Sequence, residues 1–185
     1  DAPELYSMTR KLARNANIPV PRLYMVDSNQ PNAFATGRNP ANGVVAVTSG
    51  LVNMMKRDEL EGVIAHEIAH IKNRDILIST MAAVLAGALT VIARMGMYRQ
   101  MFGRGRGGGA QALIQILAIV LAPIAALIVR SAISRTREYQ ADKVGAEISG
   151  NPNGLASALL TLERGASRTP MQVNEAASHM FIVKP

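Results

Sequence analysis

The sequence predicts one α+β domain that is mostly helical, and three observations support this prediction. A chain of 185 residues is long enough for one hydrophobic core. Long stretches repeat apolar residues at helical spacing, whereas runs of strand-forming residues are short and confined to residues 23–48. Almost half of the residues are apolar (49%) and only 18% are charged, which excludes a disordered chain and favours contact with a membrane.

Composition also limits the chemistry. The chain has no cysteine, which excludes disulfides, thiol nucleophiles and thiolate metal sites, so a transition metal must be bound by His, Asp or Glu. The formal net charge is +7, but Trp is absent and aromatic residues make up 4%. Bases would find few aromatic rings on which to stack, so no nucleic-acid partner is expected. The positive charge fits an anionic lipid surface instead.

The amino-terminal part is expected to form a helix and then a small sheet. Residues 4–17 have the apolar spacing of an amphipathic helix, which ends at the Ile18-Pro19 breaker. Three short extended runs then alternate with Asn, Pro and Gly clusters, which is typical of a small antiparallel sheet. These runs are residues 23–26, 33–36 and 44–48.

A second helix and two long uncharged stretches follow. Asp58 and Glu61 have the spacing of a capping box, so a helix is expected to begin there. Residues 76–93 and 110–129 are uncharged and would form helices roughly 27 and 30 Å long, close to the hydrocarbon thickness of a bilayer. We expect an inserted apolar helical hairpin with an Arg- and Gly-rich loop. Its environment is either the membrane or a buried or interfacial packing site.

The remaining residues predict further helices and complete the domain organisation. Helical spacing continues after residue 130 to Gly150, and Asn151-Pro152 and Thr169-Pro170 mark two more helix starts. Residues 1–75 and 130–185 are therefore expected to form one domain. Residues 76–129 form the inserted hairpin.

The segment His66-Glu67-Ile68-Ala69-His70 contains two of the three histidines of the chain. Side chains at positions i and i+4 lie on one helix face, so both imidazoles can bind a single ion. Glu67 lies beside them, where a carboxylate can act as the general base of a hydrolysis. The alternative is a pair of buried, hydrogen-bonded histidines. Burying Glu67 there without a cation would cost on the order of several kcal/mol.

A catalytic zinc ion usually has three protein ligands, so a third is needed. The candidates are His179 and the carboxylates, among which Glu138 is the strongest. Asp142 follows Glu138 by one helical turn and can accept the free ring N–H of a ligand histidine. A solvated helix face paired with neighbouring basic residues remains the alternative for both carboxylates. His179 fits either an oxyanion stabiliser or a surface position.

One further segment has two interpretations. Asn32, Ala33 and Phe34 are candidates for an exposed sheet edge that pairs with an extended substrate. An internal hairpin strand explains the same residues equally well.

The order of these motifs resembles the HtpX heat-shock family of membrane zinc metallopeptidases, which are relatives of the CAAX prenyl endopeptidases. The resemblance covers most of the chain and rests on the motifs His66-Glu67-Ile68-Ala69-His70, Arg137-Glu138-Tyr139-Gln140-Ala141-Asp142 and Asn32-Ala33-Phe34-Ala35-Thr36-Gly37. It implies a zincin-like fold with one Zn²⁺ per chain. By resemblance, the zinc ligands are His66, His70 and Glu138, the base is Glu67, and Asp142 orients a ligand histidine.

The resemblance also implies a zinc-dependent endopeptidase in quality control of misfolded membrane proteins. The expected location is a prokaryotic inner membrane, with several membrane passes and an active site facing the cytoplasm, and the expected partners are polypeptide substrates and the lipid bilayer. The family's amino-terminal transmembrane segments and carboxyl-terminal His-Pro motif are missing from this sequence, so we expect a trimmed chain. The alternative is a membrane-anchored binding or scaffold protein with a non-catalytic metal site. Glu67 favours the enzyme, because holding a metal needs only the ligands.

Overall fold

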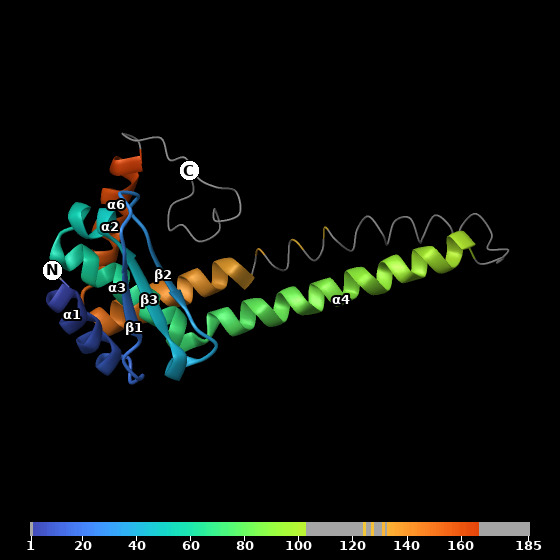
Figure 1. Cartoon of the computed structure of the whole chain (residues 1–185), viewed down its shortest axis with the longest axis horizontal. Helices are drawn as coiled ribbons and strands as arrows, with labels where there is room; N and C mark the ends of the chain where they lie inside the picture. Colours follow the sequence, from blue (N-terminus) through green and yellow to red (C-terminus); the bar gives the residue numbers. More distant parts are fainter. Residues whose placement is uncertain (1, 103–123, 125–126, 128–130, 132, 167–185) are drawn as a thin grey trace. The chain divides into compact units, whose positions relative to one another are not determined.

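A computed structural model describes residues 2–102, 124, 127, 131 and 133–166 of the chain (Figure 1). Contacts divide the chain into two units, residues 1–77 with 137–185 and residues 78–136. The first unit holds the sheet and the described candidate site residues. The expected boundaries of the hairpin, residues 76 and 129, stay a prediction, because most of its second arm lies outside the described residues.

Helix α1 (Ala2–Asn15) is the amphipathic helix expected at the start of the chain. Its buried side chains Leu5, Met8 and Leu12 recur every three or four residues and join the hydrophobic core. The helix stops where Asn17 takes a left-handed conformation (φ 55°), two residues before Pro19.

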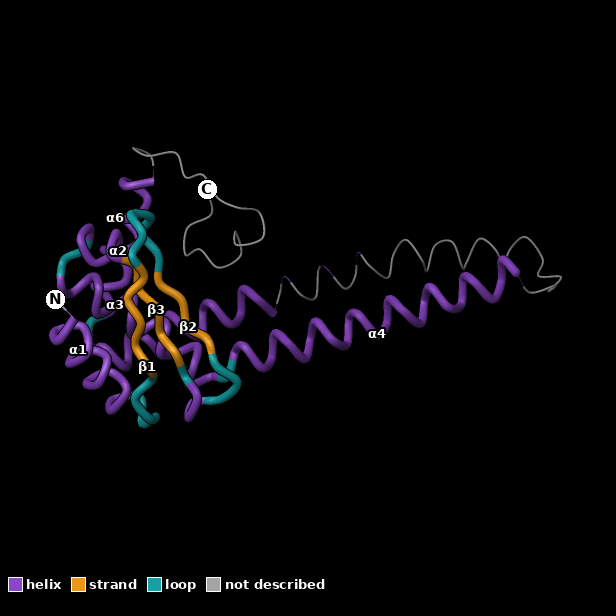
Figure 2. Tube along the Cα trace, in the orientation of Figure 1, coloured by secondary structure: helices purple, strands orange, loops and turns teal. Residues whose placement is uncertain are grey.

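The sheet contains strands β1 (Arg22–Val26), β2 (Ala33–Thr36) and β3 (Val44–Thr48), with β3 between the other two (Figure 2). Strand β3 runs parallel to β1 and antiparallel to β2. The predicted antiparallel sheet is therefore wrong in one of its two pairings, and the sheet is mixed. The chain reverses direction after β1 and again after β2, so β3 runs in the direction of β1 when it inserts beside it.

The composition of β3 explains its central position. Val45, Ala46 and Val47 are all buried, as expected for a strand covered on both faces. The edge strand β1 is mostly exposed. A 3₁₀ turn (Pro40–Asn42) lies between β2 and β3, and Asn39 caps it by accepting the N–H of Asn42.

Helix α2 (Ser49–Met54) follows β3 directly, with the Thr48 hydroxyl accepting the N–H of Leu51 at its start. Helix α3 (Arg57–Asn73) begins after Lys56, whose N–H donates to the Glu59 carboxylate over 2.9 Å. The capping box is therefore formed by Lys56 and Glu59, two residues before the predicted pair Asp58 and Glu61. Asp58 is exposed within the first turn, whereas Glu59 is buried and has partners on another helix.

Helix α3 is the centre of the first unit. Most of its side chains are buried, among them Val63, Ile64 and Ile68. Helix α6 (Pro152–Ala166) packs against it and begins at the proline expected to start a helix. The two backbones approach closely at Gly62, where an added Cβ would lie 2.4 Å from the backbone nitrogen of Leu155.

Helix α3 ends at Arg74 in a left-handed conformation (φ 58°, ψ 35°), and helix α4 (Asp75–Phe102) begins at once. Large apolar side chains such as Met81, Val84 and Leu85 are exposed along α4. Within the described residues, no helix combines the length and the apolar character that crossing a bilayer requires. The predicted apolar hairpin is not shown, since residues 110–129 lie almost wholly outside the described part.

Candidate metal centre

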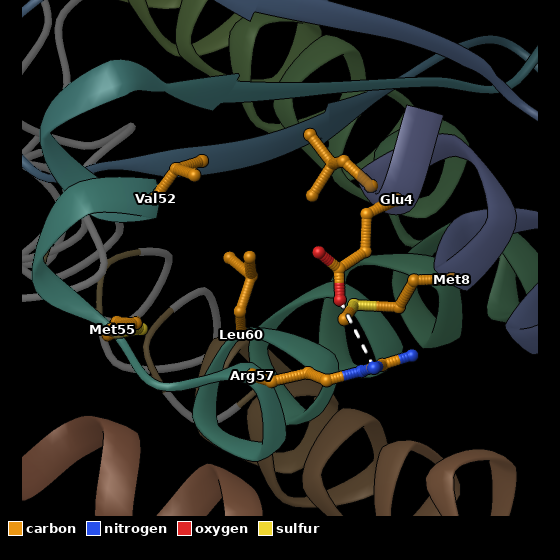
Figure 3. A pocket seen from close by; sticks show the side chains of 7 residues that line it. Glu4, Met8, Val52, Met55, Arg57 and Leu60 are labelled. Atoms are coloured by element: carbon orange, nitrogen blue, oxygen red, sulfur yellow. Dashed lines mark ion pairs between the residues drawn. The ribbon is translucent and has the colours of Figure 1, made fainter. Parts of the chain in front are cut away.

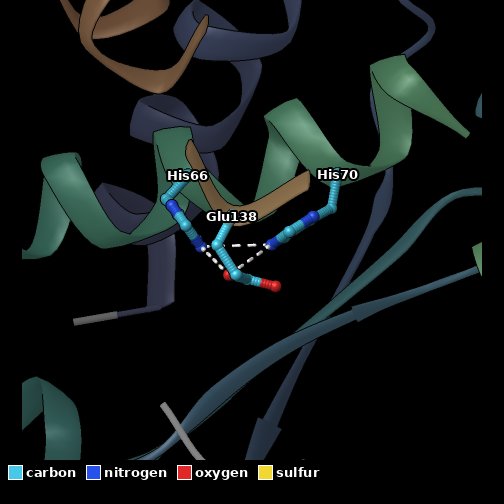
Figure 4. Close-up of side chains that lie close together, drawn as sticks. All are labelled: His66, His70 and Glu138. Atoms are coloured by element: carbon cyan, nitrogen blue, oxygen red, sulfur yellow. Dashed lines mark hydrogen bonds and ion pairs between the residues drawn. The ribbon is translucent and has the colours of Figure 1, made fainter. Parts of the chain in front are cut away.

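His66 and His70 extend from the same face of α3, one turn apart, as their spacing predicts (Figure 4). Their Nε2 atoms lie 3.1 Å apart and the rings meet edge to face, with centroids separated by 4.7 Å. Both side chains are largely buried, with exposed fractions of 13% and 16%. The helix therefore presents two imidazole nitrogens toward one point.

Glu138 reaches the same point from the helical stretch 133–149 (Figure 4). Its Oε2 atom is 3.6 Å from the Nε2 atoms of both His66 and His70. Gly145, on the same stretch, allows the close approach to α3, because an added Cβ would lie 3.1 Å from the Cα atom of His66. The fold thus brings Glu138 to the two histidines, although 67 residues separate it from His70 in the sequence.

The spacing of these three atoms fits a zinc ion. Tetrahedral zinc with nitrogen and oxygen ligands at about 2.0–2.2 Å keeps neighbouring ligand atoms roughly 3.3–3.6 Å apart. The observed separations are 3.1, 3.6 and 3.6 Å. Two neutral imidazoles and a carboxylate are also a usual ligand set of catalytic zinc.

Each histidine has a carboxylate at its other ring nitrogen. Asp142 Oδ1 lies 2.9 Å from His66 Nδ1. The angle of this contact is outside the range of a hydrogen bond, and no other described residue accepts from that nitrogen. Asp75 Oδ2 lies 2.7 Å from His70 Nδ1 and forms a hydrogen bond with it. Such contacts fix which ring nitrogen faces a metal.

The sequence predicted Asp142 for this role but missed Asp75. Asp75 follows His70 by five residues, and on a continuous helix that spacing does not place two side chains on one face. The left-handed Arg74 turns the chain between them. A carboxylate directly after the end of the histidine helix was the only signal that the sequence offered.

The electrostatics of the cluster favour positive charge at its centre. Burial lowers the pKa of His66, but the carboxylates of Asp142 and Glu138 outweigh burial and raise it to about 9. Burial also opposes protonation of His70, whose pKa the carboxylates of Asp75 and Glu138 raise to about 10. The two imidazoles hold the pKa of Glu138 well below its usual range. A divalent ion would supply that positive charge, and it competes with protons for the same ring nitrogens.

Glu67 is buried between the cluster and the sheet, with 6% of its surface exposed. Burial raises the pKa of its carboxyl, and the nearby imidazoles and a backbone hydrogen bond from Ala35 of β2 only partly offset this rise. The carboxylate is therefore held beside both the histidines and a sheet edge.

The family model of peptidase family M48 matches residues 1–182. The chain belongs to peptidase family M48. The M48 chain is 54% identical to a protease HtpX homologue of Salinibacter ruber, a match that covers 100% of this chain and 65% of that protein. It is also 54% identical to the protease HtpX homologue of Pelotomaculum thermopropionicum, covering 100% of this chain and 67% of that protein. It spans about two thirds of the length of these relatives.

A solved structure supports the fold. The crystal structure of S. mikatae Ste24p matches the M48 chain with a TM-score of 0.62 over 94% of this chain and 45% of Ste24p. The two sequences are 22% identical, so the likeness concerns the fold alone.

The other candidate residues of the M48 chain are not ligands of the cluster or lie outside the described residues. Ala33 and Phe34 belong to β2, and Asn32 precedes it with its N–H donating to the Thr48 hydroxyl over 2.8 Å. His179 lies outside the described residues. A pocket among α1, α2 and α3 contains none of the predicted site residues, and the ion pair of Glu4 and Arg57 (3.2 Å) lies at its wall (Figure 3).

Proposed function

We propose that this M48 chain carries the active site of a zinc-dependent endopeptidase. In this proposal, His66, His70 and Glu138 hold one Zn²⁺ ion and Glu67 is the general base. The observation that carries the proposal is the convergence of two imidazole nitrogens and a carboxylate oxygen, all within 4.8 Å of one another, beside the buried carboxylate of Glu67.

Zinc in such a site supplies a Lewis acid that polarises a carbonyl and makes a water more acidic. Glu67 takes a proton from the attacking water and delivers it to the amine that leaves. Burial raises the pKa of this carboxyl, which suits a group that must both accept and release a proton near neutral pH. Asp142 Oδ1, 2.9 Å from His66 Nδ1, is placed to keep the ring turned with Nε2 toward the ion.

We further propose that β2 aligns the substrate. It pairs with β3 on one side, and among the described strands none pairs with its other side. Ala35 of this strand hydrogen-bonds to Glu67, so a peptide added to the free edge would run past the general base. The N–H and the carbonyl of Asn32 both bond to Thr48 on the β3 side, so this geometry leaves the substrate-strand role to Ala33 and Phe34.

The wider setting is also a proposal. The relation to HtpX homologues supports a prokaryotic inner-membrane protein with several membrane passes, an active site facing the cytoplasm and a role in removing misfolded membrane proteins. Exposed apolar side chains along α4 are consistent with contact between residues 76–129 and lipid. The fold of Ste24p supports a zincin-like architecture for the first unit.

The test compares the wild type with Glu67→Gln and with Glu61→Gln, a control on the same helix. The amide keeps the shape of the carboxylate but accepts no proton. Glu67→Gln should therefore retain one zinc per chain and lose casein hydrolysis by roughly a hundredfold or more. Glu61→Gln should retain both properties. A wild type that binds zinc but hydrolyses no casein would favour the scaffold alternative, and an active Glu67→Gln variant would reject the base assignment.

A further inference from the structure

His70 and Glu138 are connected by a second route, on the side of the histidine that faces away from the cluster centre. His70 Nδ1 bonds to the Asp75 carboxylate over 2.7 Å. Arg137 Nη1 donates to the backbone carbonyl of the same Asp75 over 2.8 Å. Arg137 directly precedes Glu138, so the four residues form a closed circuit around one edge of the site.

Asp75 is well placed to hold His70. Its side chain is 8% exposed and follows the left-handed turn at Arg74, so little water competes for its carboxylate. A buried, charge-assisted hydrogen bond to Nδ1 leaves Nε2 directed at the cluster and makes that nitrogen a better ligand. Asp142, which faces His66, is by contrast 53% exposed.

Glu138 has less support of its own. Its side chain is 56% exposed, and the contacts found for its carboxylate are with the two histidines. Its position therefore depends on where the backbone of residues 137–142 is fixed. The side chain of Arg137, the residue before Glu138, bonds to the carbonyl of Asp75, the first residue of α4, and so ties this backbone to the junction between α3 and α4.

We infer that Asp75 and Arg137 are positioning residues of the metal site. Asp75 orients His70 through its carboxylate, and its carbonyl anchors Arg137, which sets the position of Glu138. This inference rests on the proposed zinc site. In this inference the junction between α3 and α4 positions both His70 and Glu138.

The test measures zinc affinity by competition with a chelator for the full chain and five variants. Asp75→Ala should weaken zinc binding about 10- to 100-fold, the usual cost of losing a partner of a ligand histidine. Arg137→Met keeps the length of the side chain but removes the donor, and should weaken binding on the order of tenfold. The controls Asp58→Asn and Arg135→Met change exposed residues, one in the first turn of α3 and one two positions before Arg137, and should change affinity less than about twofold.

Two further measurements separate positioning from a general loss of structure. The absorption spectrum of the Co²⁺-loaded chain reports ligand geometry and should shift in Asp75→Ala and Arg137→Met but in neither control. Asp75→Asn keeps the shape and one acceptor oxygen, so it should recover part of the affinity that Asp75→Ala loses.

The outcomes are distinct. Unchanged zinc affinity and an unchanged cobalt spectrum in Asp75→Ala and Arg137→Met would overturn the inference while leaving the proposed function in place. If Asp75→Ala and Arg137→Met do not fold in the absence of metal, the test rests on Asp75→Asn. Wild-type zinc affinity and an unshifted cobalt spectrum in Asp75→Asn would reject the role of the charged carboxylate. A wild type that binds no zinc would reject the proposed function and this inference with it.

Discussion

The hydroxyl of Ser157 donates a 2.7 Å hydrogen bond to the carboxylate of Glu59, although 98 positions separate the two residues in the sequence. Thr161, one turn further along α6, donates to the same oxygen over 2.9 Å. The N–H of Lys56 donates to the other oxygen over 2.9 Å. One carboxylate therefore caps the histidine helix and joins it to α6.

Replacing Glu59 should reveal this double role. Glu59→Gln should lower the free energy of unfolding at neutral pH by about 1–3 kcal/mol, because hydrogen bonds to a charged acceptor weaken and a half-buried donor loses its partner. Glu61→Gln, on the same helix, breaks only an exposed pair with Lys11 and should cost less than about 1 kcal/mol. Urea unfolding of the two variants and the wild type measures both values.

The difference in unfolding free energy between the wild type and Glu59→Gln should depend on pH in one direction. The backbone hydrogen bond from Lys56, followed by that from Ser157, lowers the pKa of Glu59 in the folded state below its ordinary value of 4.5. Its ionised form therefore stabilises the fold above that pH, and this stabilisation disappears as the pH falls through the lower folded-state pKa. The difference in unfolding free energy between the wild type and Glu59→Gln should become smaller in acid. A gap that stays constant down to acid unfolding would contradict the assignment.

The crossing of α3 and α6 should be equally sensitive at Gly62. An added Cβ would lie 2.4 Å from the backbone nitrogen of Leu155, and backbone cannot rotate away as a side chain can. Gly62→Ala should therefore lower the free energy of unfolding by about 1–3 kcal/mol. Gly87→Ala is the matched control, because its Cβ would meet nothing within 4 Å and alanine favours a helix by about 0.5–1 kcal/mol. Equal effects of the two changes in urea unfolding would show that the close crossing carries no constraint.

The two carboxylates on the stretch 133–149 should differ in their effect on zinc. Glu138→Ala removes a proposed ligand and should reduce zinc affinity by more than Asp142→Ala, which removes a half-exposed contact and should cost roughly 10- to 100-fold. Glu147→Ala, an exposed change on the same stretch, should have no effect. Chelator competition ranks the three variants. Full retention by Glu138→Ala would return the third-ligand role to the open candidates, including His179.

Features encoded by local periodicity were predictable from the sequence. The apolar spacing of α1 depends only on neighbours within a few turns, and so does the shared face of His66 and His70. The order of the strands was not predictable in this way, because turn residues mark where strands end but not which strands pair. The buried, uninterrupted apolar run of β3 was the available sign of a central strand.

The remaining errors have the same origin in contacts distant along the chain. Asp ranks far above Lys as a helix cap, which favoured Asp58 over Lys56. Ser157 and Thr161 of α6 bond to Glu59 and thereby favour a helix that begins after Lys56. A rule based on neighbouring residues cannot include these distant partners. Asp75 was missed because its contact with His70 requires a left-handed residue that is not glycine.

The separation of His70 from Glu138 by residues 71–137 has a consequence for the time at which activity can arise. Synthesis proceeds from the amino terminus, so a growing chain has both histidines and Glu67 long before it has Glu138 or Arg137. Under the proposed function, such a chain lacks the third ligand and cannot hydrolyse peptide bonds. The ribosome makes residues 78–136 before it reaches Glu138. A chain that is still being synthesised is therefore inactive until this segment is complete.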